Sequence, residues 1–430
     1  MVVALLSVFG LLIPGLGLVV LVLREEYFSI RALSLVIYLI EAFPGYVKII
    51  FNESSEYSIY DVNALIVYGA AIYLIFLGYS LSRHITLIRA STKATQAVFV
   101  NNRSFLILWF LTLLATLATL PILIAKAEAA GGWDNLITNL YHFRYGTFNE
   151  DTQSNAWNVL SGLYGTLSGA LILLLYGTYT KVRAQGFKLL FFVLAVCLVL
   201  VTFMALNRSS FIFLILSILG FKHSISPFSR TKMRAAIFAL FLSIMPLNYA
   251  HQYLYFLTAG WDEPTFIGSL EALQGPQGHI QTLTTILRVS AYAEPLHEEA
   301  FAESILFFVP RFFWTSKADI YGTTLVQEWA RLPTHYQMAP TTGGELLAHF
   351  GYLGITLSIL VGILFGWFDK LKHGNEVNRA AFYGLLLPRT LVNLGMGVSA
   401  ISITIFQYLL FLGVTSMANA LSRVKVKVRH

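Results

Sequence analysis

Long apolar runs alternate with short polar segments along most of this chain. We count about eleven runs, most of them roughly 17 to 25 residues long, the length that a helix needs to cross a hydrocarbon layer of about 30 Å. The runs are continuous and show no alternation of apolar and polar positions, so they predict helices rather than strands. The predicted spans are 2–23, 32–51, 62–81, 104–125, 157–180, 188–206, 209–221, 235–258, 344–368, 380–393 and 398–421.

Two connections between these runs are long, at 126–156 and 259–343. The chain shows no internal repeat and no low-complexity segment, so it predicts one all-α membrane domain over 1–430, with about eleven spans (10 to 12). The first run lacks a basic region and a small-residue cleavage site. It therefore predicts a first spanning helix and not a signal peptide.

A short amphipathic helix is predicted inside the second long connection. Ile280, Leu283, Leu287 and Ala291 recur at a spacing of three to four residues, which fits a helix lying in the membrane interface. Arg288 flanks the apolar face of this helix.

Composition supports a membrane protein and excludes several kinds of chemistry. Of the 430 residues, 57% are hydrophobic and 12% are charged, whereas soluble domains are about 25% charged. Cys197 is the only cysteine, so a disulfide within the chain and a cysteine-based metal site are excluded. No phosphate-binding glycine motif follows a strand, and no D-x-D pair stands in a long connection, so a nucleotide-dependent enzyme has no support.

The net charge of +7 is distributed unevenly. If the spans alternate, most of the 29 lysines and arginines fall on the same side as the C-terminal tail. Positive loops favour the cytoplasm, which predicts a cytoplasmic C-terminus, an outside N-terminus and two long outside connections. The positive charge therefore indicates topology, and it does not indicate a nucleic-acid partner.

A few cations remain on the outside, close to apolar segments. Arg208 occupies the tight connection Asn207–Ser210, so we expect it near headgroup depth, where a cation must snorkel or pair. Arg311 and Lys317 lie within the aromatic segment 307–322, which predicts a loop that returns to the membrane surface. Guanidinium groups there suit a phosphate ligand. The alternative is an ordinary aromatic belt, with cations that snorkel or bind native phospholipid.

Glu345 opens the ninth predicted span, and His349 follows one turn later on the same face. A carboxylate there is either a simple partner of the helix dipole or a general base at the membrane surface. The pair lacks the spacing of a zinc motif. Arg389 lies near the middle of an interrupted span, and we expect it to pair with Glu41 or with another acid that faces the bundle interior.

Several segments resemble the integral-membrane oligosaccharide repeat-unit polymerases of the Wzy type, and most of all the polymerases of enterobacterial common antigen. The similarity is sharpest in the last third of the chain, in residues 308–317 (FVPRFFWTSK), 340–345 (PTTGGE) and 366–369 (GWFD). Arg311 is followed after ten residues by Gly322, which matches an Arg-x10-Gly pattern of some members. Where members often have Lys-Pro, this chain has Lys317-Ala318, so the loop is expected to turn differently.

Two earlier segments carry the same resemblance. Asn207–Ser210 is similar to an arginine-bearing turn between two helices of the family, and Phe143–Tyr145 is similar to a segment with an arginine in the first long outside loop. The resemblance implies a GT-C-like fold in the bacterial inner membrane, with a periplasmic N-terminus and a cytoplasmic C-terminus.

The resemblance also implies an activity. Members transfer a growing glycan from undecaprenyl pyrophosphate onto a new undecaprenyl-pyrophosphate-linked repeat unit, which builds a surface polysaccharide such as O-antigen or enterobacterial common antigen. The donor is already activated, so no nucleotide, metal or other cofactor is expected. The implied partners are the lipid-linked oligosaccharides, membrane lipid and a chain-length-regulating co-polymerase.

Roles for the singled-out residues follow from this implied reaction. Arg208 and Arg311 are expected to stabilise the departing pyrophosphate, and Glu345 is expected to take the proton of the acceptor hydroxyl. The expected substrate contacts are Arg144, Arg288, Lys317 and His349. Two rival functions remain open: a ligase that moves finished glycan from the same carrier, and a transporter of lipid-linked oligosaccharide, which usually shows internal repeats.

Overall fold

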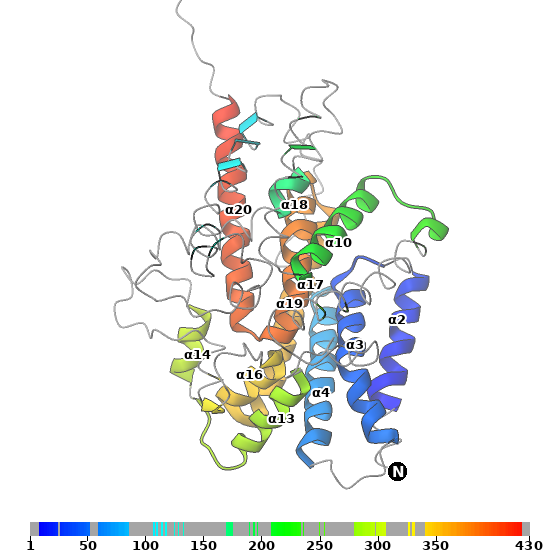
Figure 1. Cartoon of the computed structure of the whole chain (residues 1–430), viewed down its shortest axis with the longest axis vertical. Helices are drawn as coiled ribbons and strands as arrows, with labels where there is room; N and C mark the ends of the chain where they lie inside the picture. Colours follow the sequence, from blue (N-terminus) through cyan, green and yellow to red (C-terminus); the bar gives the residue numbers. More distant parts are fainter. Residues whose placement is uncertain are drawn as a thin grey trace, which may run out of the picture. The chain divides into compact units, whose positions relative to one another are not determined.

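The computed structural model of this chain is helical, and no strand occurs in the residues that it describes (Figure 1). These residues are 8–24, 26–51, 59–85, 169–174, 208–233, 279–296, 298–306 and 340–423, with shorter pieces within 106–132, 189–196, 235–253 and 326–331. The chain forms two compact units. Unit 1 comprises Met1–Ala90, Gln274–Lys370 and Arg389–Phe406, and unit 2 comprises Ser91–Leu273, Leu371–Pro388 and Gln407–His430.

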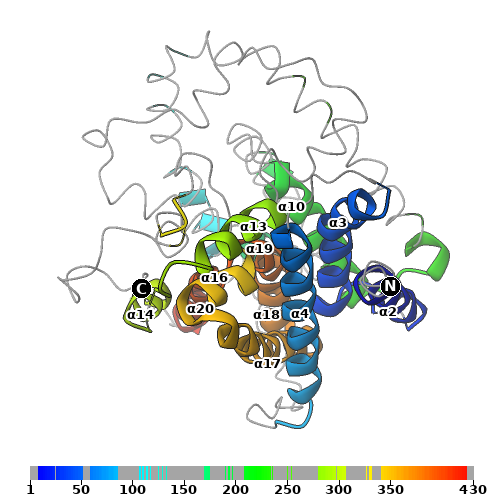
Figure 2. The same ribbon diagram turned by 90° about the horizontal axis from the view of Figure 1, so that it is seen from below.

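Unit 1 is built around one central helix, α4 (Ile59–Leu81). Its other elements are α2 (Ile13–Leu23), α3 (Ile30–Phe51), α13 (His279–Ser290), α14 (Glu298–Ile305), α16 (Thr341–Phe350), the 3-10 segment η6 (Gly351–Leu357) and α17 (Ser358–Lys370). Most of α19 (Leu387–Met396) and the start of α20 (Ser399–Arg423) also belong to it. Seen from below, α4 lies between α3 on one side and α16 and α17 on the other (Figure 2).

Glycines let α4 and α17 pack at backbone distance. A Cβ atom built on Gly362 would lie 2.0 Å from the carbonyl oxygen of Ile75, and one on Gly78 would lie 1.9 Å from the backbone of α17. Gly366 lies one turn further along, against Tyr79, so the two helices run parallel. Gly362 and Gly366 have the small-xxx-small spacing that is typical of helix pairs inside membranes.

Asp369, at the end of α17, joins three helices of unit 1. Its Oδ1 atom accepts a hydrogen bond from the backbone N–H of Ile30 at 3.2 Å, in the first turn of α3. Its Oδ2 atom accepts one from the hydroxyl of Tyr79 at 2.5 Å, on α4. The Asp369 side chain is buried, and these donors satisfy it as a buried carboxylate requires.

We predict that Asp369→Ala destabilises unit 1 by about 1–3 kcal/mol, because the Tyr79 hydroxyl and the Ile30 N–H both lose their acceptor. Asp369→Asn keeps the shape and one oxygen, so its effect should be smaller. The measurement is the Tm of the purified protein in one detergent. An Asp369→Ala variant as stable as the wild type would show that this junction contributes nothing.

Unit 2 contains a second close helix contact. Its described elements are α10 (Arg208–Ile225), the helical residues 169–174, α18 (Glu376–Ala381), the π turn η8 (Phe382–Leu386) and the later part of α20. A Cβ atom on Gly384 would lie 2.5 Å from the Cα atom of Ala170. The fully buried ring of Phe221 lies 6.3 Å from the ring of Tyr383, edge to face. Small residues again allow the backbones to meet.

Two wide π turns each precede a proline. The turn at Val8–Leu12 precedes Pro14, and the turn at Phe382–Leu386 precedes Pro388. Proline has no N–H group, and its ring clashes with the carbonyl four residues earlier, so the helix widens there. The second turn is the interruption that the sequence predicts next to Arg389.

The predicted helical class is confirmed for the described residues. Three described stretches are long and apolar enough to cross a membrane: Ile59–Leu81, Thr341–His373 and Ala400–Ala418. Phe9–Leu23 and Leu214–Ile225 are shorter apolar helices. The predicted spans at 104–125, 157–180, 188–206 and 235–258 lie largely outside the described residues. The count of eleven spans and the GT-C-like arrangement therefore stay predictions.

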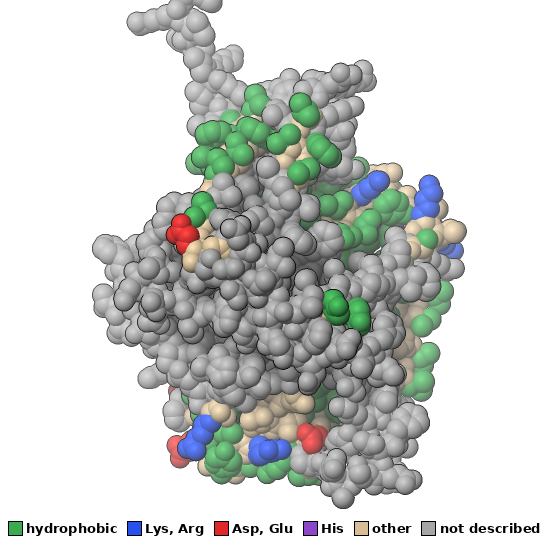
Figure 3. All heavy atoms as spheres, viewed as in Figure 1, with side chains coloured by type: hydrophobic (Ala, Val, Ile, Leu, Met, Phe, Trp, Pro, Cys, Tyr) green, Lys and Arg blue, Asp and Glu red, His purple; other side chains and the backbone are tan. Residues whose placement is uncertain are grey.

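Apolar side chains cover the outer face of α2, along the right-hand edge of the molecule (Figure 3). A second exposed apolar stripe follows α4, through Ile66, Tyr73, Leu77 and Leu81. Faces of this kind are costly in water and favourable in lipid. The described part of the chain is thus a helical, membrane-associated protein.

The predicted ninth span, 344–368, is not one straight helix. Gly351 has φ +64° and ψ −161°, which is not a helical conformation. A Cβ atom on Gly354 would lie 2.1 Å from the carbonyl oxygen of Leu346, although residues eight apart in a straight helix are about 12 Å apart. The chain therefore turns sharply between α16 and η6, and α16 is a separate short helix.

The helix predicted at 280–291 is confirmed as α13, and its location in a membrane interface stays a prediction. Leu283, Ile286 and Leu287 are almost completely buried, and α13 packs against α4 and α16. The central part of its apolar face is therefore covered by protein. Arg288 flanks this face, as predicted, and is exposed.

Candidate functional site

The short helix α16 is the most deeply buried element that carries predicted site residues. Residues Thr341–His349 are all buried. Two glycines allow this position: a Cβ atom on Gly343 would lie 2.9 Å from the Cβ of Ala71, and one on Gly344 would lie 3.1 Å from Leu283. The start of α16 is therefore wedged between α4 and α13.

The wedge lies deep along α4. Ala71 is close to the midpoint of the helix, about 18 Å from its first residue. Glu345 follows Gly343 by about half a turn. The start of α16 therefore packs against the middle of α4 and not against either of its ends. Glu345 was expected to open a span; the apolar stretch in the structure is Thr341–His373, so Glu345 lies in the second turn of its first helix, α16.

Thr341 explains why the helix begins four residues before Glu345. Its hydroxyl accepts a hydrogen bond from the N–H of Gly344 at 3.1 Å, which satisfies one of the free donors of the first turn. Thr341 itself has φ +60°, an unfavourable conformation for a β-branched residue. Glu345 falls after the first turn of α16, which contains no acidic residue. A partnership with the dipole of its own helix, one of the two predicted roles, is therefore not supported.

The carboxylate of Glu345 lies against the break between α19 and α20. A Cβ atom on Gly397 would lie 2.0 Å from Oε2 of Glu345. Gly397 has φ +105°, a conformation that strongly favours glycine. Because α20 begins at Ser399, the carboxylate is close to the N-terminal end of another helix, where N–H groups favour an anion. Glu345 is fully buried in this arrangement.

His349 shares the burial of Glu345 one turn further along α16. Its ring lies 5.3 Å from the ring of Phe301 on α14, edge to face. The carbonyl next to it, on Ala348, accepts a hydrogen bond from Leu296 N–H at 2.9 Å. α14 and the segment before it thus cover the end of α16 that carries the histidine.

Arg288 stands at the end of α13, against the first turn of α4. Its guanidinium carbon lies 5.8 Å from the ring centre of Tyr60. One turn earlier on α13, the hydroxyl of Thr284 donates to Oδ1 of Asp61 at 3.1 Å. Tyr60 and Asp61 were not predicted as site residues, because nothing local in the sequence links them to α13.

The other predicted arginines are not placed relative to this site. Arg208 is the first residue of α10, in unit 2, and its side chain is outside the described part. Arg144, Arg311 and Lys317 lie outside the described residues. The structure brings together Glu345 and His349 on α16, with Arg288 on the adjacent α13. The convergence of the remaining cations on these residues stays a prediction.

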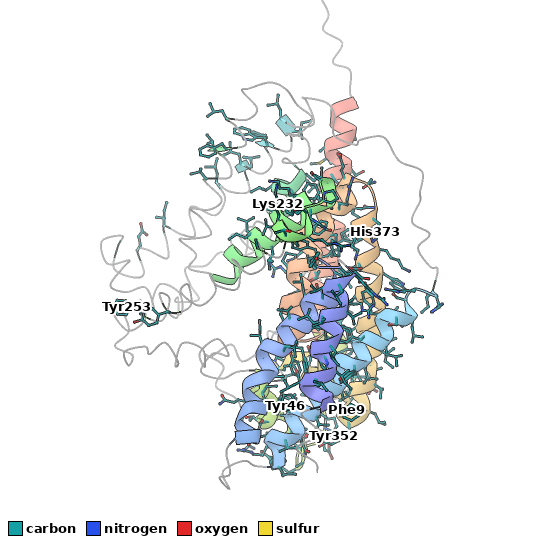
Figure 4. The ribbon with its side chains drawn as sticks, turned by 90° about the vertical axis from the view of Figure 1, so that its right-hand side faces the viewer. Phe9, Tyr46, Lys232, Tyr253, Tyr352 and His373 are labelled. Carbon is teal, nitrogen blue, oxygen red and sulfur yellow. The ribbon has the colours of Figure 1, made fainter. Side chains whose placement is uncertain are left out.

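Tyrosines form a further polar group within unit 1. The hydroxyl of Tyr68 donates to Glu41, and the rings of Tyr38 and Tyr68 lie 5.2 Å apart. Tyr46 and Phe9 lie at the same end of this unit (Figure 4). Glu41 therefore has a tyrosine partner, and the expected pairing of Glu41 with Arg389 stays a prediction.

Within the described residues, no group of three or more histidine, cysteine or acidic side chains is arranged to hold a metal ion. The described residues thus form a helical, membrane-associated protein with a carboxylate buried inside a helix bundle. No protein-family model, no curated protein and no solved structure matches the chain.

Proposed function

We propose that this protein is a membrane glycosyltransferase of the repeat-unit polymerase type. It transfers a growing glycan from undecaprenyl pyrophosphate onto a new lipid-linked repeat unit, at the outer face of a bacterial inner membrane. One observation carries the proposal. The segment 340–345, which resembles the family, forms the start of the buried helix α16. It holds the fully buried carboxylate of Glu345, and α16 packs against α13, the helix that carries Arg288.

The contacts within unit 1 are those that the proposed alternation of spans requires, whichever face is outside. Thr284 bonds Asp61, and both belong to the predicted outer side. At the other end, Lys370 donates to the carbonyl of Ser82 at 2.7 Å, and both belong to the predicted inner side. An alternating chain with the start of α4 outside requires this grouping.

The reaction is a direct displacement at the anomeric carbon of the donor glycan. The bond from this carbon to the pyrophosphate oxygen breaks while the acceptor oxygen bonds to it, and the acceptor proton passes to a base. Arg208 and Arg311 stabilise the charge that develops on the leaving pyrophosphate, with Arg144 and Lys317 as further contacts. This charge stabilisation requires no metal ion.

Glu345 is the proposed base, with His349 as the alternative. Because its carboxylate is fully buried against Gly397, it reaches an acceptor hydroxyl only after the junction between α19 and α20 moves. Substrate binding is the proposed cause of that movement, as in enzymes whose sites close or open around their ligands.

We predict that Arg208→Ala and Arg311→Ala each reduce polymer formation by about a hundredfold or more, because each removes a donor to the leaving group. The assay lengthens purified lipid-linked repeat units and resolves the products by size. Arg24→Ala, at an exposed arginine on the predicted inner side, is the control and should retain activity. Polymer of normal length and yield in either test variant would remove that arginine from the mechanism.

A transporter of lipid-linked oligosaccharide is the second candidate. The favouring observation is that a buried acid lies between two interrupted helical segments, with non-helical glycines at Gly351 and Gly397. Transporters often bind substrate at such breaks. Purified protein in liposomes distinguishes the two functions: a transporter moves the lipid-linked unit across the bilayer without lengthening it. A ligase would instead cap a separate acceptor with glycan of fixed length.

A further inference from the structure

We infer that the junction of α13 with the first turn of α4 is a sugar-binding subsite, separate from the contacts to pyrophosphate. Four side chains form this α4–α13 cluster: Tyr60, Asp61, Thr284 and Arg288. The inference rests on the proposed function, since it takes the substrate to be a lipid-linked glycan. It assigns Arg288 to the sugar portion of that substrate.

Two side-chain contacts between α4 and α13 form the cluster. Thr284 and Arg288 are one turn apart on α13 and therefore share a face. Thr284 donates to Asp61 at 3.1 Å, and the guanidinium carbon of Arg288 lies 5.8 Å from the ring centre of Tyr60. Each residue of the consecutive pair Tyr60-Asp61 thus has its own partner on α13.

The cluster is accessible from the surface. Arg288 is exposed, while Tyr60 and Asp61 are half-buried. Basic and acidic side chains lie near one another on the surface over α13 and the start of α4 (Figure 3). Among the described residues, the contact of the Arg288 guanidinium is the Tyr60 ring, which leaves its N–H groups available for a ligand.

The charges of the cluster favour a neutral ligand. One guanidinium and one carboxylate cancel, and the Asp61 carboxylate repels an approaching diphosphate. A sugar is better matched, because its hydroxyl oxygens accept hydrogen bonds from a guanidinium group such as that of Arg288. Its apolar C–H face packs on an aromatic ring such as Tyr60.

The cluster and the proposed catalytic acid both adjoin α13. The same helix, α13, places Leu283 and Ile286 against Gly344, the residue before Glu345. The cluster and the acid therefore lie on two sides of one twelve-residue helix. A glycan held at the α4–α13 cluster would be anchored one helix away from the reacting group.

The test measures binding to the purified full-length protein in detergent, by isothermal titration calorimetry. The first probe is the repeat-unit oligosaccharide released from its lipid by mild acid, which carries no phosphate, and the second is inorganic pyrophosphate. Tyr60→Ala and Arg288→Ala should weaken oligosaccharide binding about tenfold and leave pyrophosphate binding unchanged. Tyr60→Phe keeps the ring and should bind normally. Tyr292→Ala, at an exposed tyrosine just beyond α13, is the matched control.

Each other outcome has a distinct meaning. If Arg288→Ala weakens pyrophosphate binding and spares the oligosaccharide, the cluster is a phosphate site and the inference is wrong. If a wild-type protein that lengthens lipid-linked units binds no free oligosaccharide, or if both alanine variants bind it normally, the inference fails and the proposed function stands. Oligosaccharide binding that depends on Tyr60, without any lengthening, supports the subsite and contradicts the polymerase. A protein that neither binds nor lengthens contradicts both.

Discussion

Gly362→Val should destabilise the protein by about 3 kcal/mol or more, because the added side chain has no space at the α4–α17 contact. The first added carbon would lie 2.0 Å from the carbonyl oxygen of Ile75 and 2.7 Å from its carbonyl carbon. Both atoms belong to the backbone of α4, so no rotamer change removes the clash. The two parallel helices must separate, and the hydrogen bonds of Asp369 to Tyr79 and Ile30 at the end of α17 are then at risk.

The measurement is the thermal unfolding of the purified variant in a fixed detergent, together with its yield in the membrane fraction. Gly413→Val is the matched control, since Gly413 also lies inside a helix but a Cβ atom added to it would meet no other atom within 4 Å. Both substitutions change helix propensity equally. Equal Tm values for the two variants would show that the α4–α17 contact is not tight.

The helices could be predicted from hydropathy, and their breaks could not. The apolar run of α4 predicted a helix at 62–81 that the structure gives as Ile59–Leu81. The run at 344–368 is equally apolar, yet it turns at Gly351. The exposed residues of this turn, Tyr352 and Leu353, are themselves apolar, so no polar residue marks the break. The pair Gly351 and Gly354 was the available signal, since glycine supplies both the positive φ and the close approach to Leu346.

The site was predicted in part, for a similar reason. Glu345 and His349 could be proposed from local spacing, and they do share the buried helix α16. The partner surfaces are distant in the sequence: Gly397 follows Glu345 by about fifty residues, and Asp61 precedes Thr284 by more than two hundred. No local pattern records such contacts, because they depend on how the helices pack.

Gly397→Ala should be the most damaging substitution at the proposed site, because it combines two costs. A residue with a Cβ atom at φ +105° loses about 1–2 kcal/mol. The same Cβ atom would lie 2.0 Å from Oε2 of Glu345, so the buried carboxylate must also leave its position near the start of α20. Displacing a buried anion from its partners costs about 1–3 kcal/mol more. Under the proposed function, turnover falls as well, since the base is displaced.

Gly351→Ala separates the cost of the positive φ from the cost of the clash with the carboxylate. Gly351 also has positive φ, at +64°, but a Cβ atom added to it would meet no other atom within 4 Å. Its substitution should therefore cost about 1–2 kcal/mol from the backbone alone. The difference in Tm between the two glycine variants reports the contact with the carboxylate.

A double-mutant cycle tests directly whether the extra cost of Gly397→Ala comes from its contact with Glu345. In a Glu345→Ala background the carboxylate is gone, so Gly397→Ala should cost no more than Gly351→Ala does. The expected coupling between positions 345 and 397 is about 1–3 kcal/mol, from free energies of unfolding measured for the four proteins. Additive effects would mean that the two residues do not meet in the folded protein. In that case the junction between α19 and α20 cannot control the acid, and the movement proposed for its catalytic role loses its basis.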